Sequence, residues 1–389
     1  MKKLGLVFTD GVSLEQWVDQ GLFSREKQIY EEHLKQNHFD KIVWFTYGVN
    51  DQYIRNELVQ NGELDEKILV IPMPKLFDNK VLKPLYSYLI PYIHRNECKE
   101  LDIIKTNQMA GAWTAAIIHK KYGIPFLLRT GYTYSTNYRR LYEQEKKIRK
   151  KIKYYYKSRK YIGIEKKIYR ICNWATVSSK HDKEYICANY HVSSKKIEIV
   201  GNYVDTNLFK PKKGMERKNR FIYVGRYGTE KNLFNMIKAM EQAHVGVDLY
   251  GSGELQHELE SFIQQNGYDA QLKGSVDNKE LPNILNQYRY FILVSHHEGM
   301  PKALLEAMAC GLICVGTNVE GINEVIRDEY NGVIANEINA DSISRAVIKA
   351  LNIEIQKKIY RNLDKEIQNY SLRMIVEKEW EVISKMILK

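Results

Sequence analysis

Glu298-Gly299-Met300-Pro301-Lys302-Ala303-Leu304-Leu305-Glu306 is the stretch of this sequence that decides the fold. A short apolar run at 290–294 precedes it and another at 313–315 follows it, and both are typical of buried strands. Between them an apolar segment begins near Pro301 and stops before Gly311, residue types that favour the start of a helix and the position after its end. The stretch therefore predicts strand, loop, buried helix and strand.

The predicted helix offers both a binding end and an unusual charge. Its N-terminus carries unpaired N–H groups and a partial positive charge, which suit a phosphate. Glu306 is the one charge in the middle of an otherwise apolar helix, and a buried carboxylate requires a partner. Two alternatives stay open: an ion pair with Lys302, four residues earlier, or hydrogen bonds from the hydroxyls of a bound ligand.

The spacing of Glu298 and Glu306 resembles the E-x7-E motif of retaining nucleotide-sugar glycosyltransferases of family 4, which have the GT-B fold. Three further motifs resemble that family in order and spacing over about residues 200–335. They are Val224-Gly225-Arg226 with Glu230-Lys231-Asn232, Gly251-Ser252-Gly253-Glu254-Leu255, and Lys273-Gly274-Ser275-Val276. Each motif alone is weak, and together they are a strong indication.

The resemblance implies roles for individual residues. Breaking a sugar–nucleotide bond places negative charge on the leaving diphosphate, which fixed cations and N–H dipoles stabilise. The resemblance implies that Arg226 and Lys231 hold this diphosphate, that Glu298 contacts the donor sugar, and that Glu306 binds the ribose; we expect Glu298, Arg226 and Lys231 to be catalytic. The implied donor-binding residues are Gly11, Gly225, Gly251, Gly253, Val276, Met300, Lys302, Ala303 and Glu306. For the two cations, a structural ion pair with Glu230 or Glu241 is the alternative.

We expect no metal and no cofactor, because Arg and Lys supply the positive charge. His296 and His297 next to Glu298 invite a metal hypothesis. Adjacent residues at a strand end point in opposite directions, however, so the two histidines do not easily share one ion.

Strand-like and helix-like segments alternate along the whole chain, which predicts an α/β fold with parallel, doubly wound sheets. The resemblance implies a GT-B fold, with two Rossmann-like domains facing a central cleft. We expect an N-terminal, acceptor-binding domain at 1–203, a C-terminal domain that binds the nucleotide sugar at 204–370, and a C-terminal helix at 371–389 that packs back on the first domain.

The acceptor side departs from the family pattern in the loop after the apolar run at 126–128. Many family members carry a histidine there, and this chain has Thr130, Gly131 and Tyr132 instead. Asn107 and Gln108, at the end of the preceding predicted strand, are further candidates for sugar contacts. Ordinary loop polarity is the alternative for all five.

Positive charge is concentrated in one segment, which begins at Lys146 and ends at Arg170. It holds twelve Lys and Arg against one Glu, while the whole chain has 389 residues and a net charge of +12. Ile148, Ile152 and Tyr155 form one apolar stripe if the segment is helical. A basic amphipathic helix with tyrosines predicts contact with an anionic membrane surface; a solvated helix face and RNA binding are the alternatives, and no nucleic-acid module accompanies it.

Other features of the composition bear on the compartment. Five cysteines without a C-x-x-C pattern favour reduced thiols in a cytoplasm. Neither a signal peptide nor a bilayer-spanning stretch is expected. The apolar, aromatic segment at 81–93 is too short to span a bilayer and predicts either a core helix or one lying on the surface.

These observations predict a retaining glycosyltransferase, transferring a hexose or an N-acetylhexosamine from a nucleotide sugar. We expect a UDP-sugar donor and a saccharide acceptor, lipid-linked, at the cytoplasmic face of the membrane in surface-glycan synthesis. One alternative is a nucleotide-sugar 2-epimerase of the same fold, which requires acid/base carboxylates in both domains. The other is a non-catalytic basic protein that binds membrane or RNA.

Overall fold

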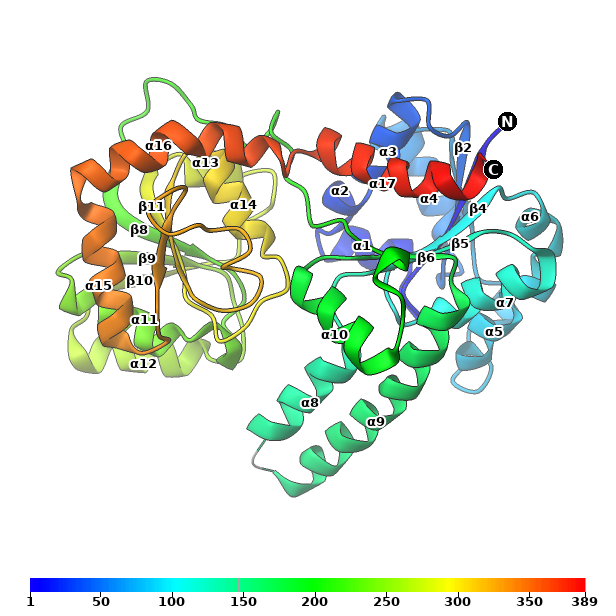
Figure 1. Cartoon of the computed structure of the whole chain (residues 1–389), viewed down its shortest axis with the longest axis horizontal. Helices are drawn as coiled ribbons and strands as arrows, with labels where there is room; N and C mark the ends of the chain where they lie inside the picture. Colours follow the sequence, from blue (N-terminus) through cyan, green and yellow to red (C-terminus); the bar gives the residue numbers. More distant parts are fainter. Residues whose placement is uncertain (146, 389) are drawn as a thin grey trace. The chain divides into compact units, whose positions relative to one another are not determined.

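The computed structural model describes residues 1–145 and 147–388, so Lys146, the first residue of the basic segment, lies outside the described part. The chain divides into two compact units. Unit 1 comprises Met1–Val200 and Val376–Lys389, and unit 2 comprises Gly201–Ile375. Each unit has its own parallel sheet and its own apolar core, and each is described by itself (Figure 1).

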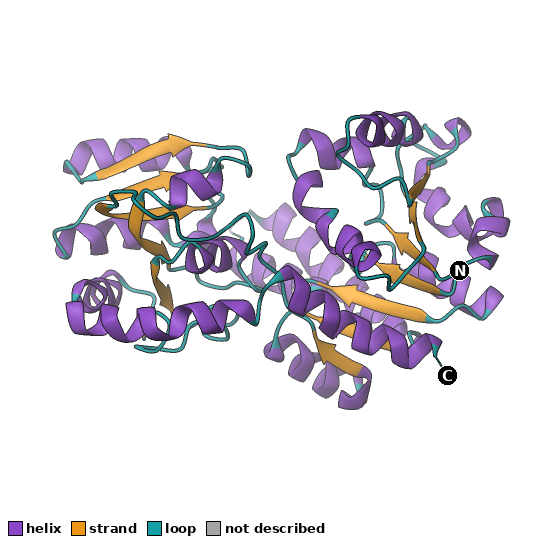
Figure 2. Ribbon diagram, turned by 90° about the horizontal axis from the view of Figure 1, so that it is seen from above, coloured by secondary structure: helices purple, strands orange, loops and turns teal. Residues whose placement is uncertain are grey.

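Unit 1 is built on a seven-stranded sheet in the order β3-β2-β1-β4-β5-β6-β7, and every strand pair is parallel. The strands are β1 (Lys3–Val7), β2 (Lys41–Phe45), β3 (Ile68–Ile71), β4 (Ile103–Thr106), β5 (Phe126–Thr130), β6 (Trp174–Val177) and β7 (Ile197–Ile199). Most of their residues are buried on both faces, as expected for strands of a parallel sheet covered by helices on both sides (Figure 2).

The helices of unit 1 connect these strands. They are α1 (Leu14–Asp19), α2 (Phe23–Glu26), α3 (Gln28–Lys35), α4 (Asp51–Gln60), η1 (Lys75–Phe77), α5 (Lys83–Ile93), α6 (Arg95–Lys99), α7 (Ala112–Tyr122), α8 (Tyr134–Gln144), α9 (Ile148–Ile171), α10 (Lys180–Tyr190) and η2 (Ser194–Lys196). Ser13 caps α1 with a reciprocal Ser13–Gln16 capping box. The buried Asp51 carboxylate also accepts hydrogen bonds from the amides of Leu14 and Glu15, which fixes the loop that follows β1.

Unit 2 repeats the architecture with a six-stranded parallel sheet in the order β10-β9-β8-β11-β12-β13. Its strands are β8 (Lys218–Val224), β9 (Val247–Tyr250), β10 (Ala270–Gly274), β11 (Tyr288–Leu293), β12 (Ile313–Thr317) and β13 (Val333–Ala335). Its helices are η3 (Thr229–Lys231), α11 (Leu233–Gln242), α12 (Gln256–Asn266), α13 (Leu281–Leu285), α14 (Lys302–Ala309), α15 (Ala340–Leu351) and α16 (Ile353–Gln368). The predicted order of strand, loop, helix and strand around Glu298 is confirmed by β11, α14 and β12.

Each sheet has one point at which the strand order reverses. In unit 1 it lies between β1 and β4, and in unit 2 between β8 and β11. Ligands of doubly wound sheets bind at the carboxyl ends of the strands beside such a switch point, where the two flanking loops diverge. The fold alone therefore directs attention to the loops after β1 and β4 in unit 1, and after β8 and β11 in unit 2.

The last helix, α17 (Leu372–Ile387), starts in unit 2 and runs into unit 1. A buried cluster holds it there: the Lys105 ammonium of β4 donates to the Glu379 carboxylate, and His33 Nε2 lies 3.4 Å from the same carboxylate oxygen. His38 stacks on Trp380 with ring centroids 4.4 Å apart. Burial opposes ionisation of Glu379, but Lys105 and His33 outweigh it and hold the pKa of this carboxyl below its usual value.

Two antiparallel helices, α8 and α9, stand away from the sheet of unit 1 as a hairpin (Figure 1). A run of stacked tyrosine rings joins them: Tyr132 to Tyr134 at 4.7 Å, Tyr134 to Tyr161 at 4.8 Å, and Tyr161 to Tyr138 at 5.5 Å. Lysines of α9 cap tyrosines of α8 by cation–π contact, as Lys157 does over Tyr138. From Ile148 on the basic segment is helical, and its apolar stripe residues Ile148, Ile152 and Tyr155 are exposed.

Among the described residues, no helix combines the length and the apolar character needed to cross a bilayer.

Candidate functional site

Lys231 and Glu298 meet at the switch point of unit 2. Lys231 ends η3 after β8, and Glu298 lies in the loop after β11. Lys231 Nζ lies 2.7 Å from Glu298 Oε1, and the Ser295 hydroxyl donates to the same oxygen at 2.7 Å. The His296 amide also donates to the Glu230 carbonyl at 2.8 Å, which ties the two loops together. The structure thus brings together two of the three residues for which we predicted catalytic roles.

Arg226, the third of these residues, lies at the rim. Its guanidinium donates to Glu230 at 2.7 Å, which is the ion pair that the sequence left open as the alternative. The Arg226 side chain is 73% exposed. Burial raises the pKa of the Glu230 carboxyl. The hydrogen bond from Arg226 acts in the opposite direction and contributes to a pKa of Glu230 below its ordinary value. The Arg226 charge is therefore at the surface of the site, where an anion can approach it.

Two glycines let neighbouring backbone segments touch beside Arg226. At Gly251, with φ of +147°, an added Cβ would lie 1.9 Å from the Gly225 carbonyl oxygen. At Gly253 it would lie 2.5 Å from the Tyr227 carbonyl oxygen. These contacts, with hydrogen bonds such as Tyr227 N to Ser252 O at 2.9 Å, pack the loop after β9 against the loop after β8. The glycines predicted to contact the donor thus have a clear structural role as well.

The predicted phosphate-binding helix end is α14, whose N-cap residue, Pro301, makes no side-chain capping bond. The backbone amides of Lys302 and Ala303 lie in its first turn, where N–H groups have no intrahelical acceptor. Asn202 fixes the approach to the helix, because its amide group donates to the Met300 carbonyl at 2.6 Å. Glu306 lies one turn further along and is 5% exposed.

Gly321 is a residue of this region that sequence reasoning missed. An added Cβ at Gly321, with φ of +79°, would lie 1.8 Å from the Gly299 carbonyl oxygen, so only glycine lets the loop after β12 support the Glu298 loop. The ring of Tyr203 lies under the Lys302 ammonium at 5.1 Å. Val276, one of the predicted donor-binding residues, follows β10 and is exposed. The hydroxyl of the neighbouring Ser275 donates to the Ser252 hydroxyl at 2.9 Å.

A polar cavity of about 440 Å³ opens at the switch point of unit 1. Gly11 after β1 and Asn107 and Gln108 after β4 contribute to its wall, so three residues predicted from the sequence lie together. Its other lining residues are Thr9, Asp10, Val12, Gln16, Trp17, Gln20, Leu22, Arg25 and Glu26. The lining mixes carboxylates, amides and a guanidinium with apolar side chains, which suits a ligand rich in hydroxyl groups.

Asp10 is a charged residue of this cavity that the sequence analysis did not single out. Partial desolvation raises the pKa of Asp10, while a hydrogen bond with Ser87 of α5 and the nearby charge of Lys160 of α9 act in the opposite direction. Burial, then Tyr138 and then Asp10 raise the pKa of Tyr161 to about 12. The Asp10 carboxylate is thus coupled electrostatically to α5 and to the hairpin.

The three other acceptor-side candidates do not line the cavity. Thr130 is buried, and its hydroxyl lies 2.9 Å from the Tyr169 hydroxyl, so its side chain faces α9. Gly131 donates its amide to Gln108 Oε1 at 2.9 Å and so positions a residue that does line it. Tyr132 begins the tyrosine stack.

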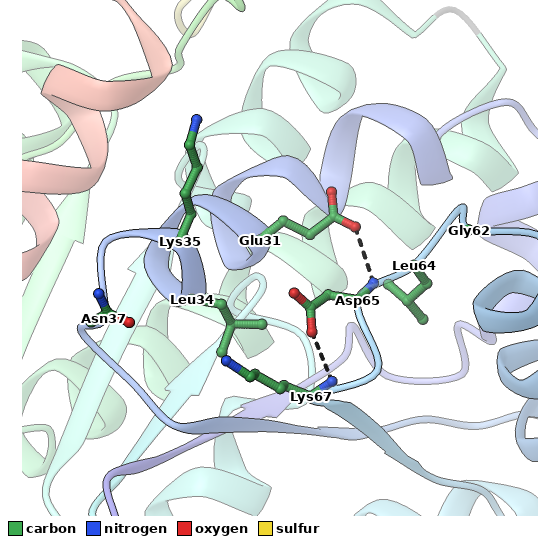
Figure 3. Close-up of a pocket in the computed structure, with 8 residues that line it drawn as sticks. All are labelled: Glu31, Leu34, Lys35, Asn37, Gly62, Leu64, Asp65 and Lys67. Atoms are coloured by element: carbon green, nitrogen blue, oxygen red, sulfur yellow. Dashed lines mark hydrogen bonds between the residues drawn. The ribbon is translucent and has the colours of Figure 1, made fainter.

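A further hollow lies beside β3, an edge strand of the unit 1 sheet, at the end where this strand starts. Figure 3 shows that its two carboxylates, Glu31 and Asp65, are engaged with backbone amides, those of Asp65 and Lys67. It is open and lies away from the carboxyl ends of the strands, so we assign it no ligand.

Within residues 1–145 and 147–388, no three His, Cys, Asp or Glu side chains are grouped as a metal site would require.

Comparison with known proteins agrees with this geometry. The family model described as Glycosyltransferase Family 4 matches residues 32–208, and the one described as Glycosyl transferases group 1 matches residues 205–370. An Escherichia coli UDP-Gal:alpha-D-GlcNAc-diphosphoundecaprenol alpha-1,3-galactosyltransferase is 26% identical over 328 residues, which are 79% of this chain and 81% of that protein.

Two other proteins extend the comparison. A Campylobacter jejuni N-acetylgalactosamine-N,N'-diacetylbacillosaminyl-diphospho-undecaprenol 4-alpha-N-acetylgalactosaminyltransferase is 28% identical over 192 residues, 48% of this chain and 52% of that protein. The crystal structure of Anabaena HepE in complex with UDP and glucose superposes with a TM-score of 0.70 at 15% identity, and covers 99% of this chain and 100% of that one.

Together the two family models span residues 32–370, and the chain belongs to glycosyltransferase family 4, with the two-domain GT-B fold. It is a glycosyltransferase.

Proposed function

We propose that this enzyme transfers a hexose or an N-acetylhexosamine from a UDP-sugar to a lipid-linked saccharide, with retention of the anomeric configuration. The observation that carries the donor half is the Lys231–Glu298 pair, at 2.7 Å beside the N-terminus of α14. It places a cation for a leaving diphosphate next to a carboxylate for sugar hydroxyls, within reach of helix N–H groups. UDP is supported by the E. coli relative, whose name specifies UDP-Gal, and by the UDP complex of HepE.

In the proposed reaction, an acceptor hydroxyl oxygen forms a bond to the anomeric carbon on the face from which UDP departs. The bond from that carbon to the phosphate oxygen breaks, and its electron pair leaves with the diphosphate. The proton of the acceptor hydroxyl passes to a donor phosphate oxygen. Lys231, Arg226 and the α14 amides stabilise the charge that develops, so the reaction proceeds without a bound metal.

The lipid-linked acceptor is supported by the two bacterial relatives, whose names both specify diphosphoundecaprenol-linked saccharides. We propose that the cavity beside Asp10 receives the saccharide. We further propose that the enzyme works at the cytoplasmic face of the membrane and that α9 adsorbs to anionic lipid. Arg149, Lys150 and Lys153 are exposed on α9, and each cation near an anionic surface contributes about 1 kcal/mol.

A donor screen followed by a transfer assay tests this function. UDP-, GDP- and dTDP-sugars are compared by thermal shift, and a ligand at about 100 times its dissociation constant adds about 2.7 kcal/mol of stability. The stabilising donor is then incubated with a polyprenyl-diphosphate saccharide, with EDTA present, and the product is analysed for linkage and anomeric configuration. No transfer from any donor, an inverted product, or activity that requires added Mg²⁺ or Mn²⁺ contradicts the corresponding part of the proposal.

Adsorption through α9 is tested by co-sedimentation with anionic vesicles at low salt. The substitutions Arg149→Gln, Lys150→Gln and Lys153→Gln together should remove most of the salt-sensitive part of the pelleting, because each removes one exposed cation. The matched control removes three cations from α16, namely Lys357, Lys358 and Lys365, and should pellet like wild type. Equal loss in both triple variants would show that net charge, and not α9, determines adsorption.

A further inference from the structure

Helix α5 carries a core-like apolar stripe on the side that faces solvent. Its exposed members are Leu85, Tyr88, Leu89, Tyr92 and Ile93, at spacings i, i+3, i+4, i+7 and i+8. Leu85 is 49% exposed, Tyr92 is 55% exposed, and Val81 just before the helix is 77% exposed. The opposite side is packed in the core through Tyr86, Ser87, Ile90 and Pro91. The helix is therefore apolar on both sides, and one of these sides has no covering layer.

Such a surface is unusual for a soluble protein, because a contiguous exposed apolar patch marks a place where another apolar partner docks. Isolated exposed apolar residues occur elsewhere in the chain, such as Ile348 on α15 and Ile353 at the start of α16. The segment from Leu76 to Ile93 differs, since it holds seven large exposed apolar side chains: Leu76, Val81, Leu85, Tyr88, Leu89, Tyr92 and Ile93.

Lysines surround the patch and indicate the charge of its partner. Lys75, Lys80 and Lys83 precede or open α5, and the Lys121 ammonium lies 3.4 Å from the centroid of the Tyr92 ring. Within the described part of the chain, none of these four lysines forms a salt bridge with a carboxylate. Two tyrosines with polar hydroxyls and apolar rings complete the stripe, and such side chains favour the boundary between water and lipid.

We propose that the exposed side of α5 inserts into the headgroup region of an anionic lipid bilayer. Leucine and isoleucine side chains enter the acyl boundary, the tyrosines lie at headgroup level, and the lysines contact lipid phosphates. The proposed contact on α9 is mainly electrostatic, whereas this one is mainly apolar. It does not depend on the proposed transfer reaction.

The buried side of α5 connects this surface to the cavity at the switch point of unit 1. Ser87, on that side, accepts a hydrogen bond from Trp113 Nε1 at 3.0 Å and lowers the pKa of Asp10, which lines that cavity. Trp113 also stacks on Tyr88 of the exposed stripe, with ring centroids 5.6 Å apart. The helix that carries the proposed membrane surface thus has, on its buried side, a residue that influences the cavity residue Asp10.

Vesicle co-sedimentation at two salt concentrations tests the proposal with the full chain. At about 1 M salt the Debye length falls to about 3 Å, so electrostatic adsorption is lost while apolar insertion remains. We expect wild type to keep binding phosphatidylglycerol-containing vesicles at high salt. The double variant Leu85→Gln, Leu89→Gln should lower the salt-resistant partition coefficient about tenfold, because two side chains no longer transfer apolar area into lipid.

The matched control is Ile348→Gln with Ile353→Gln, which changes two apolar residues of unit 2 that are more exposed than Leu85 and Leu89, and it should bind like wild type. A second variant, Val81→Gln with Ile93→Gln, changes the two ends of the patch and provides an independent test if the first is poorly folded by circular dichroism. Unchanged salt-resistant binding in both α5 variants would overturn the proposal. It would also be overturned if wild type formed a dimer in sedimentation velocity that the α5 substitutions dissociate, because a second copy would then cover the patch.

Discussion

The two switch points of this enzyme differ in how their functional groups are assembled. In unit 2, Arg226, Lys231, Glu298 and Glu306 come from two short stretches, after β8 and after β11, and backbone contacts at Gly251 and Gly321 hold the loops. In unit 1 the pKa of Asp10 is influenced by Ser87 of α5 and by the charge of Lys160 of α9, which are 77 and 150 positions further along the chain. Both sites are made by tertiary packing, since Lys231 and Glu298 are themselves 67 positions apart, but the unit 2 residues belong to two short motifs and the unit 1 residues do not.

The two switch points therefore differ in how substitution would affect them. The unit 2 loops are constrained by close backbone approach, so substitution there disturbs the geometry itself. The unit 1 cavity is lined by side chains from the loops after β1 and β4 and from α1 and α2, and residues of such loops and surface helices can change without altering the sheet beneath them.

The largest effect is expected for the pair that anchors α17 beside β4. Glu379→Ala leaves the Lys105 ammonium buried without its carboxylate, which should cost about 3–5 kcal/mol of unfolding free energy. Chemical denaturation measures this, and Glu381→Ala on the exposed side of α17 is the control. Because the substitution lies in unit 1, the affinity for UDP, measured at a temperature well below the unfolding transition, should be unchanged. A parallel loss of UDP affinity would show that the two units are not independent in binding.

Lys231→Ala should have the next largest effect and lies in unit 2. Removing a group that stabilises the leaving diphosphate should lower kcat about 10²–10³-fold. Lys279→Ala, which removes an exposed lysine of the same unit, should leave kcat unchanged. Steady-state kinetics at saturating acceptor measure both. Full activity of Lys231→Ala would remove this residue from the mechanism.

Asp10→Asn should act on the other substrate. It keeps the size of the side chain but removes the charged acceptor, so the KM for the saccharide should rise about tenfold. A matched change outside the cavity, Asp78→Asn on the loop before α5, should not alter it. If Asp10→Asn instead changed only kcat, the carboxylate would take part in the chemical step and not in acceptor binding.

The smallest effect concerns pH and the cluster around α17. Burial, followed by the nearby charges of His33 and Lys2, lowers the pKa of His38 to about 4, with Glu32 opposing. The unfolded histidine, with a pKa of about 6.5, takes up its proton first as the pH falls. Stability from His38 is therefore complete above about pH 6.5 and is lost progressively towards pH 4. His38→Asn should reduce the change of melting temperature between these two pH values. An unchanged pH dependence of the melting temperature would show that other groups cause it.

The sequence predicted the α/β fold class, the position of most strands and the family because these depend on local patterns. Tyr288–Leu293, Lys302–Ala309 and Ile313–Thr317 form the predicted strand–helix–strand unit. It did not predict Asp10, whose neighbours come from distant segments. Nor could it determine which side of 81–93 is buried, because both sides of α5 are apolar and only the packing against α7 distinguishes them. Thr130 was predicted at the acceptor site, yet the strand places its side chain against Tyr169.

The assignment of the donor to unit 2 and of the acceptor to unit 1 is tested most directly by titrating UDP into three proteins in a calorimeter. We predict that Glu306→Gln weakens UDP binding about tenfold or more relative to wild type, because the ribose hydroxyls lose a charged acceptor. Asp10→Asn should bind UDP with wild-type affinity. Wild-type affinity in Glu306→Gln, or a comparable loss in Asp10→Asn, would contradict the assignment of the donor to unit 2.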